Sequence, residues 1–390
     1  MPDRYIIHYA ELGLKGRNRI NFERRLVSNI ETALGDLGPV KVRRFHSYLS
    51  VTVPPTPPAA QIEHRLRRIP GIAYFAPVTV TALDLAVITK TALSMAKDTI
   101  TPEMSFRVRS TRGNKQFPMT SPEIDRHVGG EVQDLTQARV DLTDADVTLS
   151  IQIYDDEAYL FARRIKGLGG LPVGSAGRVL ALFSGGIDSP VSAHLMMKRG
   201  CAMDFVHFHL LRGSEALRTS KIVAMARQVL APHRTPGRLY MASAAPFEAA
   251  MASLDSRVAT VVFRRFIMRV ADKLARHRRA QALITGESVG QVASQTLKNI
   301  NLIARATDLP ILRPLIAMDK LEIIDLARQI ETYDLSIQPY RDPCSLHSRR
   351  PATWAKLEDV LAVEDEIGAE ALVTETLANH IEEIRITFDA

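Results

Sequence analysis

Along the first 80 residues, apolar and polar positions follow strand-like and helix-like patterns in turn. Runs with strand-like alternation flank a segment whose apolar residues recur at helical spacing. Prolines at positions 54, 55, 57 and 58 then end the second β-like region. The predicted elements are strand Tyr5–Tyr9, helix Asn18–Leu34, strands within Val40–Val53, helix Ala60–Arg68 and strand Tyr74–Val80. This β-α-β-β-α-β order favours a ferredoxin-like α+β domain over residues 1–74.

A second α+β domain is predicted over residues 75–165. Its pattern indicates helix Leu83–Lys97, strand Ser105–Arg109, helix Ser121–Leu135 and strands Thr148–Tyr154 and Tyr159–Arg163. Residues 166–178 hold five glycines and one proline, a composition typical of a linker or of a loop that approaches another backbone closely.

From Val179 onward the pattern becomes an alternation of short apolar strands with helical stretches. A helix over Pro190–Lys198 follows the first strand directly. The predicted strands are Val179–Phe183, Ala202–His209, Arg238–Met241, Ala282–Thr285 and Ile311–Arg313. Such alternation is typical of a doubly wound parallel sheet with helices on both faces. We therefore expect one α/β domain over residues 179–390, ending in a helical tail, so that the chain combines α/β and α+β domains.

The composition excludes several classes of protein. Hydrophobic residues make up 46% and charged residues 24% of the 390 residues, as in ordinary globular proteins. No apolar run reaches the length of a membrane span, and the start lacks the apolar core of a signal peptide. The two cysteines can form neither a disulfide framework nor a four-thiolate metal site. We therefore expect a cytoplasmic protein without membrane contact and without a permanently bound metal.

The positive charge is concentrated in the N-terminal third. The net charge is +7, and residues 1–126 carry 19 Lys/Arg against 11 Asp/Glu, so the remainder is close to neutral. One interpretation is a solvated basic surface. The other is a domain that binds a polyanion, because neutralisation of phosphates by Lys and Arg supplies most sequence-independent affinity for nucleic acids.

A glycine- and serine-rich turn follows the first strand of the third domain. Its sequence is Ser184-Gly185-Gly186-Ile187-Asp188-Ser189-Pro190. Two glycines allow an anion to approach the backbone, the serines add hydroxyl donors, and the next helix presents its free N–H groups. The spacing and the lysine of a Walker loop are missing. The alternative is an ordinary strand–turn–helix connection, but the segment resembles the pyrophosphate loop (PP-loop) of ATPases that adenylate a substrate oxygen.

Further segments narrow this resemblance, and together they span nearly the whole chain in order. They are Glu11–Asn18, Phe106–Phe117 with Thr120 and Ser121, Gly169–Ser175, Met196–Gly200, Phe205–His209, Arg264–Arg265, Thr285–Thr296 and Arg313–Lys320. The chain resembles the tRNA 4-thiouridine synthase (tRNA sulfurtransferase, ThiI) family. The resemblance implies a ferredoxin-like domain, a THUMP RNA-binding domain and a PP-loop domain.

The resemblance also implies a set of nucleotide-binding residues, with ATP and Mg²⁺ as cofactors. Asp188 would help to hold magnesium and pyrophosphate, and Lys320 matches a lysine needed for activity. The expected ATP contacts are Leu182, Phe183, Ser184, Gly185, Gly186, Asp188, Ser189, His207, Phe208, Arg264, Gly286 and Gln295. Structural interpretations stay open: His207 or His209 could be an interior histidine, Arg264 a surface charge, and Gly286 only a loop glycine.

The two cysteines have different surroundings in the sequence. Cys344 lies in a polar loop with Arg341, His347 and Arg349, and positive neighbours lower the pKa of a thiol. The resemblance implies that Cys344 takes part in sulfur transfer. Cys201 lies at the start of a strand and suits core packing, although it is the only other thiol that could resolve a persulfide intermediate.

The source of sulfur stays open at this point. The sequence ends at Ala390, so the resemblance is to a short form without a C-terminal rhodanese domain. Cys344 could receive a persulfide from a cysteine desulfurase, sulfide could attack directly, or a separate rhodanese could act. Sulfur transfer to a carrier protein of thiamine synthesis is a further alternative, and the resemblance also suggests a homodimer.

Basic residues suggest where the N-terminal half would bind RNA. Arg107 and Arg109 project from one face of a strand, close to Arg112, Lys115 and Phe117. Lys15 and Arg17 begin a second basic group. These residues could simply protect a sheet edge. With the THUMP resemblance, we predict that they contact the acceptor stem of tRNA through shape and phosphates.

The predicted activity is therefore ATP-dependent formation of 4-thiouridine at a tRNA uridine, position 8 in the family. The C4 oxygen is adenylated with release of pyrophosphate, and sulfur then displaces AMP. The alternatives are another adenylating ligase or tRNA-modifying enzyme with the same loop, and an RNA-binding protein without catalytic activity.

Overall fold

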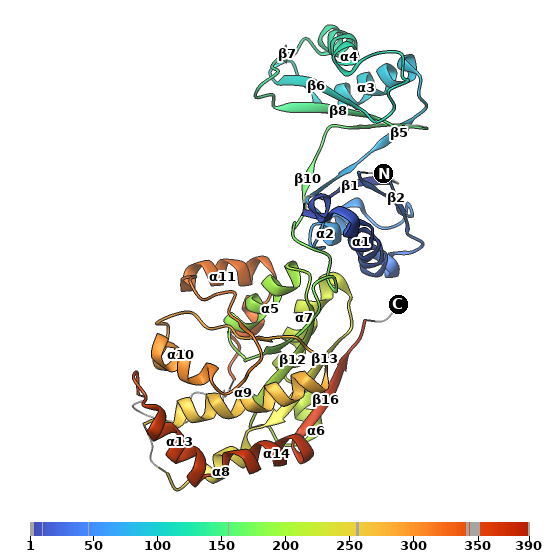
Figure 1. Cartoon of the computed structure of the whole chain (residues 1–390). Coiled ribbons are helices and arrows are strands. Elements are labelled where there is room, and N and C mark those ends of the chain that lie inside the picture. Colours follow the sequence, from blue (N-terminus) through green and yellow to red (C-terminus); the bar gives the residue numbers. More distant parts are fainter. Residues whose placement is uncertain are drawn as a thin grey trace. The chain divides into compact units, whose positions relative to one another are not determined.

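The computed structural model describes residues 4–9, 11–45, 47–154, 156–254, 257–340, 343 and 352–388 (Figure 1). The chain forms two compact units, Met1–Gly169 and Gly170–Ala390, and each is described by itself. Among the described residues, none of the helices combines the length and the apolar character needed to traverse a bilayer.

The first part of unit 1 is ferredoxin-like, as predicted. Its helices and strands are β1 (Arg4–His8), α1 (Arg19–Leu34), β2 (Lys41–Arg44), β3 (Leu49–Thr52), α2 (Ala59–Leu66) and β4 (Tyr74–Pro77). The antiparallel sheet has the order β10-β4-β1-β3-β2. Its core includes Tyr5, Ile7 and Leu26, which are fully buried. The predicted strand Tyr74–Val80 divides after Pro77, and its second part joins another sheet.

The second part of unit 1 carries its own sheet, with the strand order β5-β9-β8-β6-β7. Its elements are β5 (Thr79–Thr81), α3 (Leu85–Thr99), β6 (Ser105–Arg112), α4 (Ser121–Thr136), β7 (Arg139–Val140), β8 (Val147–Ile153) and β9 (Ala158–Phe161). Helix α4 begins at a capping box formed by Thr120 and Glu123. After β9 the chain returns as β10 (Ile165–Lys166), which pairs with β4 of the ferredoxin-like sheet.

Unit 2 is built on a six-stranded sheet with the order β15-β14-β11-β12-β13-β16. The strands are β11 (Arg178–Leu182), β12 (Ala202–His209), β13 (Gly237–Ser243), β14 (Leu283–Ile284), β15 (Ile311–Leu312) and β16 (Ile381–Ile386). The first five are parallel, as predicted. The predicted helical tail is wrong at its end, because β16 pairs with β13 in antiparallel register and buries Ile384 and Ile386.

The helices of unit 2 surround this sheet. They are α5 (Asp188–Lys198), α6 (Ser214–Arg218), α7 (Lys221–Leu230), α8 (Ala245–Met251), α9 (Ala259–His277), α10 (Leu297–Ala304), α11 (Lys320–Gln329), α12 (Tyr333–Ser336), α13 (Leu357–Glu366) and α14 (Ala369–Asn379). Strand order reverses at β11, because β12 lies on one side and β14 on the other. In open α/β sheets, ligands bind at such a reversal, beyond the carboxyl ends of the strands.

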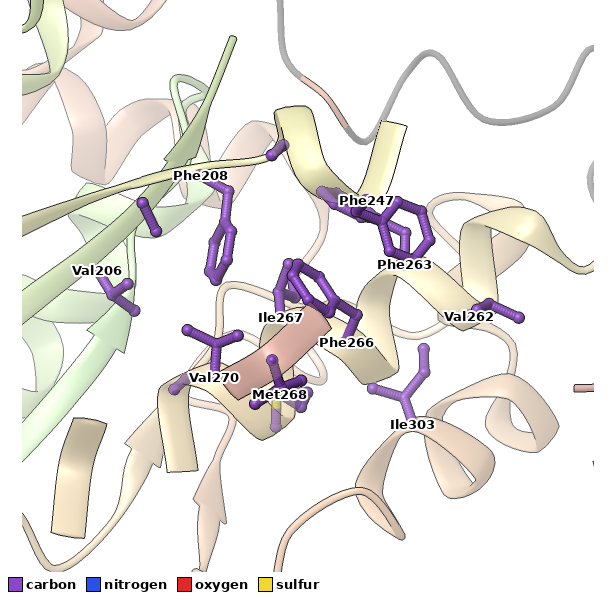
Figure 2. Packing of buried hydrophobic residues seen from close by; sticks show 14 of the residues in the cluster. Val206, Phe208, Phe247, Val262, Phe263, Phe266, Ile267, Met268, Val270 and Ile303 are labelled. Atoms are coloured by element: carbon purple, nitrogen blue, oxygen red, sulfur yellow. The ribbon is translucent and has the colours of Figure 1, made fainter. Parts of the chain in front are cut away.

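The largest core described in unit 2 forms around α9, in which 12 of the 19 residues are buried. Figure 2 shows Phe263 and Phe266 of this helix packed near Phe247 and Phe208. The ring centroids of Phe208 and Phe266 lie 6.1 Å apart in an edge-to-face arrangement, which favours aromatic packing. This core packs the aromatic side chains of α9 against Phe208 near the end of β12, and so fixes that strand end.

Candidate active site

The turn after β11 is held closed by its own serines. The Ser184 N–H donates a hydrogen bond to Ser189 Oγ at 2.9 Å, and the Ser189 hydroxyl donates to the Ser184 carbonyl at 3.1 Å. The Gly186 N–H donates to Ser184 Oγ at 3.3 Å. Helix α5 begins at Asp188, so its first free N–H groups lie beside the turn. A strand-to-helix turn of this kind is suited to bind phosphate.

Two glycines of the site have neighbours that leave no space for a side chain. A Cβ on Gly185 would lie 2.8 Å from the Tyr340 ring, and a Cβ on Gly286 would lie 3.0–3.1 Å from backbone atoms of Asp188 and Ser189. Gly286 follows β14, so its close approach sets the distance between that strand end and the phosphate turn. The structure therefore gives Gly286 a packing role beyond that of a loop glycine.

The Gly286→Ala variant is expected to weaken ATP binding by about tenfold, because overpacking typically costs 1–3 kcal/mol and here displaces the phosphate turn. Gly130→Ala is the control, since a Cβ on Gly130 meets nothing within 4 Å. Titration calorimetry with ATP measures the affinity. Equal dissociation constants for the two variants and the wild type would contradict this role of Gly286.

A cavity of about 300 Å³ opens at the carboxyl ends of β11 and β12. Its lining includes the apolar residues Val206, Phe208 and Ile267 as well as polar groups of the phosphate turn. Among the residues predicted to contact ATP, these line the cavity: Leu182, Phe183, Ser184, Gly186, Asp188, Ser189, His207, Phe208, Arg264, Gly286 and Gln295. Gly185 of the same set lies against Tyr340 instead. A volume of this size is at the lower end of the range of small-molecule sites.

The predicted catalytic residues Asp188 and Lys320 are in direct contact. Lys320 Nζ lies 2.6 Å from Asp188 Oδ1, and the Gln291 side-chain amide donates to Asp188 Oδ2 at 3.0 Å. Lys320 is the first residue of α11, where Asp319 caps the helix through the N–H groups of Leu321 and Glu322. The cap fixes the start of α11, and so brings a lysine to the phosphate turn from 132 positions further along the chain.

The structure adds a buried acid that the sequence interpretation did not assign. Glu287 is 3% exposed and accepts hydrogen bonds from Arg264 Nη1 at 3.3 Å and Arg313 Nε at 2.7 Å. The Thr285 hydroxyl donates to it at 3.0 Å. Glu287 therefore holds the guanidinium group of Arg264, which lines the cavity, together with that of Arg313. In the sequence, Glu287 is an isolated acidic residue between Gly286 and Gly290. Without the fold, this pattern does not indicate that Glu287 binds two arginines.

The two histidines of β12 differ in their contacts. His207 is 2% exposed, and its Nδ1 lies 2.6 Å from the Phe183 carbonyl while its Nε2 lies 2.6 Å from the Tyr340 hydroxyl. His209 accepts a hydrogen bond from the Leu211 N–H, and burial lowers its pKa below the usual value. Only His207 lines the cavity. Both histidines are buried, and His209 is the one whose described contacts lie away from the cavity.

The structure describes one of the two cysteines and also allows a search for metal-binding clusters. Cys344 lies outside the described residues. Cys201 is buried among apolar side chains, and this burial raises the pKa of its thiol, which disfavours the thiolate. Within the part of the chain that the structure describes, no three His, Cys, Asp or Glu residues cluster to hold a metal ion.

The predicted RNA-contacting residues lie in unit 1 and differ in exposure. Arg109, Lys115 and Arg17 are exposed, and Lys15 lies with its ammonium 5.2 Å from the Phe22 ring centroid. Phe117 packs in the core of the second sheet. Arg107 donates to Thr148 Oγ1 and to the carbonyls of Leu142 and Thr143, and Arg112 donates to the Phe117 carbonyl. Two of these arginines, Arg107 and Arg112, are thus held in fixed orientations, and the Phe117 ring is enclosed.

Family profiles match three consecutive parts of the chain. The profile described as the ThiI ferredoxin-like domain matches residues 4–76, the THUMP domain profile residues 82–163, and the profile described as Thiamine biosynthesis protein (ThiI) residues 174–368.

Curated relatives match over almost their full length. A probable tRNA sulfurtransferase from Moorella thermoacetica is 40% identical over 377 residues, which cover 96% of this chain and 95% of that protein. Another from Alkaliphilus oremlandii is 38% identical, with 99% of this chain and 100% of that protein covered.

Among solved structures, the chain is similar to a 4-thiouridine synthetase crystallised in complex with RNA and bound ATP. The TM-score is 0.87 and the sequence identity 29%, and the match covers 98% of this chain and 99% of that one. A structure from Pyrococcus horikoshii has the same fold over 84% of this chain, with a TM-score of 0.65 and 24% identity.

The fold and the cavity therefore define a PP-loop α/β domain that follows a ferredoxin-like domain and a THUMP domain. This confirms the predicted fold class. The chain belongs to the tRNA sulfurtransferase (ThiI) family, which is a family of enzymes.

Proposed function

We propose that this enzyme uses ATP to convert a tRNA uridine, position 8 in the family, to 4-thiouridine by way of an adenylated C4 oxygen. The observation that carries the proposal is the phosphate turn with the Asp188–Lys320 pair at the edge of the 300 Å³ cavity. Such a turn can hold the leaving pyrophosphate, while the apolar residues of the lining can accommodate a nucleobase. The similar 4-thiouridine synthetase was crystallised with RNA and bound ATP, which supports both substrates.

Different residues of the cavity would bind the phosphates and the adenine of ATP. N–H groups of the phosphate turn and of the start of α5 would contact the phosphates, and Phe208 and Ile267 would pack against the adenine. Arg264 lines the cavity and Lys320 contacts Asp188 of the lining, so both would supply positive charge where negative charge develops during attack on the α-phosphate. Glu287 keeps Arg264 oriented toward the cavity rather than toward solvent.

Mg²⁺ fits this donor set. Magnesium is usually held by one or two carboxylates together with substrate phosphates and water, rather than by a cage of protein ligands. Asp188 offers one such carboxylate at the phosphate turn, and no larger acidic cluster occurs among the described residues. Asp188 would thus hold the ion, which neutralises the charge of the leaving pyrophosphate.

Sulfur transfer completes the reaction. In the first step the uridine C4 oxygen attacks the α-phosphorus of ATP, and pyrophosphate leaves. Free sulfide would then attack C4 and displace AMP. If Cys344 carries a persulfide, its terminal sulfur attacks C4 and AMP leaves. A second thiol then attacks the Cys344 sulfur, which forms a disulfide and releases 4-thiouridine, and an external dithiol must reduce the disulfide. Cys201 is the only other thiol in the chain.

The partners follow from these steps. We propose that tRNA contacts the exposed basic residues of unit 1, including Arg17, Arg109 and Lys115, and that a cysteine desulfurase supplies the sulfur. Because the proposed sulfur transfer needs free thiols, we propose that the protein acts in a reducing compartment such as the cytoplasm. The homodimer suggested by the resemblance is part of the same proposal, and sedimentation equilibrium tests it.

One assay tests this function. Purified protein is incubated with unmodified tRNA, Mg-ATP and either sulfide or a cysteine desulfurase with cysteine. We expect near-ultraviolet absorbance of 4-thiouridine and one AMP for each thiouridine formed. In the desulfurase reaction, Cys344→Ser should lose about a hundredfold or more of the rate, because it lacks the nucleophile. Release of AMP without tRNA would instead indicate another adenylating ligase.

A further inference from the structure

The short segment that precedes α13 is fastened to the start of α10. The side-chain amide of Asn299, a fully buried residue, donates to the Ala352 carbonyl at 2.9 Å, and its Oδ1 accepts from the Ala355 N–H at 3.1 Å. The Thr296 hydroxyl donates to the Thr353 carbonyl at 2.8 Å. Three hydrogen bonds to consecutive parts of one segment fix its course along the helix.

The start of α10 adjoins the nucleotide cavity. Val292 and Gln295 line this cavity, and α10 begins two residues after Gln295, at Leu297. The Asn299 amide also donates to the carbonyl of Ala293, which lies between the two lining residues, at 2.8 Å. One buried side chain therefore ties the segment before α13 to the loop that forms part of the cavity wall.

Trp354 is the side chain that this segment presents to solvent. It is 69% exposed, although tryptophan is on average a highly buried residue. Lys298 Nζ lies 3.5 Å from the centroid of its ring, within the range of a cation–π contact. Because the ammonium covers one face of a ring that is mostly exposed, the other face is open. Leu297, on the same turn of α10 as Lys298, is 70% exposed.

The chemistry of this surface fits a nucleic acid. The two joined stretches, 296–299 and 352–356, carry Lys298 and Lys356 as their charged residues, and both are exposed cations. Aromatic rings accompanied by Lys or Arg are typical stacking sites for unpaired bases, since every base has a flat face and the cations attract phosphates. Enzymes that modify a base take it out of its stack, which leaves its neighbours without a stacking partner.

We infer that Trp354, backed by Lys298, stacks on a base of the tRNA segment that carries the target uridine, and so holds that segment beside the nucleotide cavity. The inference rests on the proposed function. Trp354 takes part in no bond-making step, because it is absent from the cavity lining, and its effect is on delivery of the uridine to bound ATP.

Fluorescence tests the contact directly, because Trp354 is the only tryptophan of the chain. Unmodified tRNA is titrated into the protein with Mg²⁺ and an ATP analogue that cannot be cleaved between the α- and β-phosphates. The difference in emission between wild type and Trp354→Phe isolates this residue. We expect tRNA to quench it with a saturating curve and a cysteine desulfurase alone to leave it unchanged. Unchanged emission at saturating tRNA, or a change with the desulfurase alone, overturns the inference.

Single-turnover formation of AMP, at saturating tRNA and Mg-ATP, measures the consequence. Trp354→Ala and Trp354→Leu should lower the rate about tenfold to a hundredfold, the value of one base–aromatic stack. Trp354→Phe keeps a ring and should stay within about threefold of wild type. Lys298→Met should lower the rate roughly two- to fivefold through loss of the cation–π contact. Leucine keeps apolar area without a flat face, so a normal rate for Trp354→Leu would indicate an apolar docking surface for a protein and overturn the inference.

Matched controls change similar residues elsewhere in unit 2. Leu361→Ala alters an exposed apolar residue of α13, and Lys273→Met an exposed lysine of α9, and both should keep the wild-type rate. The affinity for Mg-ATP should be the same in all variants. A loss of ATP affinity that accounts for the loss of rate would mean that Trp354 only supports the cavity wall, which overturns the inference. Absence of AMP and thiouridine from wild type contradicts the proposed function, whereas a Trp354→Ala enzyme as fast as wild type contradicts the stacking role alone.

Discussion

The Asp188→Asn variant is expected to lower the rate of tRNA-dependent AMP formation by about 10²–10³-fold, the range found when one preorganised electrostatic group is removed from an active site. Asp188 is the carboxylate of the phosphate turn, and its two oxygens contact Lys320 and Gln291. The amide keeps the shape but loses the charge that would hold Mg²⁺ and orient Lys320. A stopped assay of AMP at saturating Mg-ATP measures the effect.

A matched control for Asp188→Asn lies on the neighbouring helix. Asp325 of α11 is largely exposed and pairs with Arg328 one turn away, so Asp325→Asn should leave the rate unchanged. Both variants should melt within a few degrees of wild type, since neither site belongs to the core. An Asp188→Asn enzyme within threefold of the wild-type rate would remove Asp188 from the proposed mechanism.

The second large effect concerns stability rather than catalysis. Arg265 of α9 and Glu364 of α13 are each 4% exposed and form a two-point ion pair, with Nε–Oε1 at 2.7 Å and Nη2–Oε2 at 3.2 Å. Arg269 adds a third bond to Glu364 at 2.6 Å. Glu364→Ala leaves a buried guanidinium without its carboxylate, a change that costs about 3–5 kcal/mol. Thermal unfolding should start roughly 6–20 °C lower, at about 2–4 °C per kcal/mol.

Glu366→Ala, in the same helix but exposed, tests whether loss of any glutamate from α13 has this effect. It should change the melting temperature by no more than about 1–2 °C, as surface substitutions usually do. The double variant Arg265→Met, Glu364→Leu should regain part of the lost stability, because apolar side chains often replace a buried ion pair at little cost. Equal melting temperatures for Glu364→Ala and wild type would contradict the structural role of this pair.

Much of the fold could be predicted because its signals are local. The strand before Ser184 and the helix after it were predicted from apolar spacing and from the glycines of the turn, and the structure confirms both. The final strand could not be predicted in the same way. Residues 381–386 alternate only weakly, and they become a strand because β13, whose paired residues lie 139 to 149 positions earlier, offers an unpaired edge.

The site shows the same division between local and distant information. The resemblance identified Asp188 and Lys320 one at a time, whereas their 2.6 Å contact depends on how α11 packs beside α5. Glu287 and Tyr340 belong to no recognisable sequence motif. Glu287 can be assigned to the site only once the fold brings Arg264 and Arg313 to it. Tyr340 can be assigned only once its hydroxyl is seen to lie 2.6 Å from His207 Nε2. The roles that the proposed function assigns to Asp188, Lys320 and Glu287 stay predictions.

Strand β10 has a mechanical consequence for unit 1. Because the polypeptide leaves the ferredoxin-like sheet after β4 and comes back to pair with that same strand, the THUMP domain is an insertion tethered at both of its ends. Rotation about one backbone bond cannot turn the THUMP domain relative to the ferredoxin-like domain. The connection from β4 to β5 and the connection from β9 to β10 would both have to rotate. Stacking of Tyr48 on Tyr154, with ring centroids 4.2 Å apart, resists the same torsion. An RNA bound to unit 1 would thus contact two domains that resist rotation against each other, rather than two domains joined by one flexible linker.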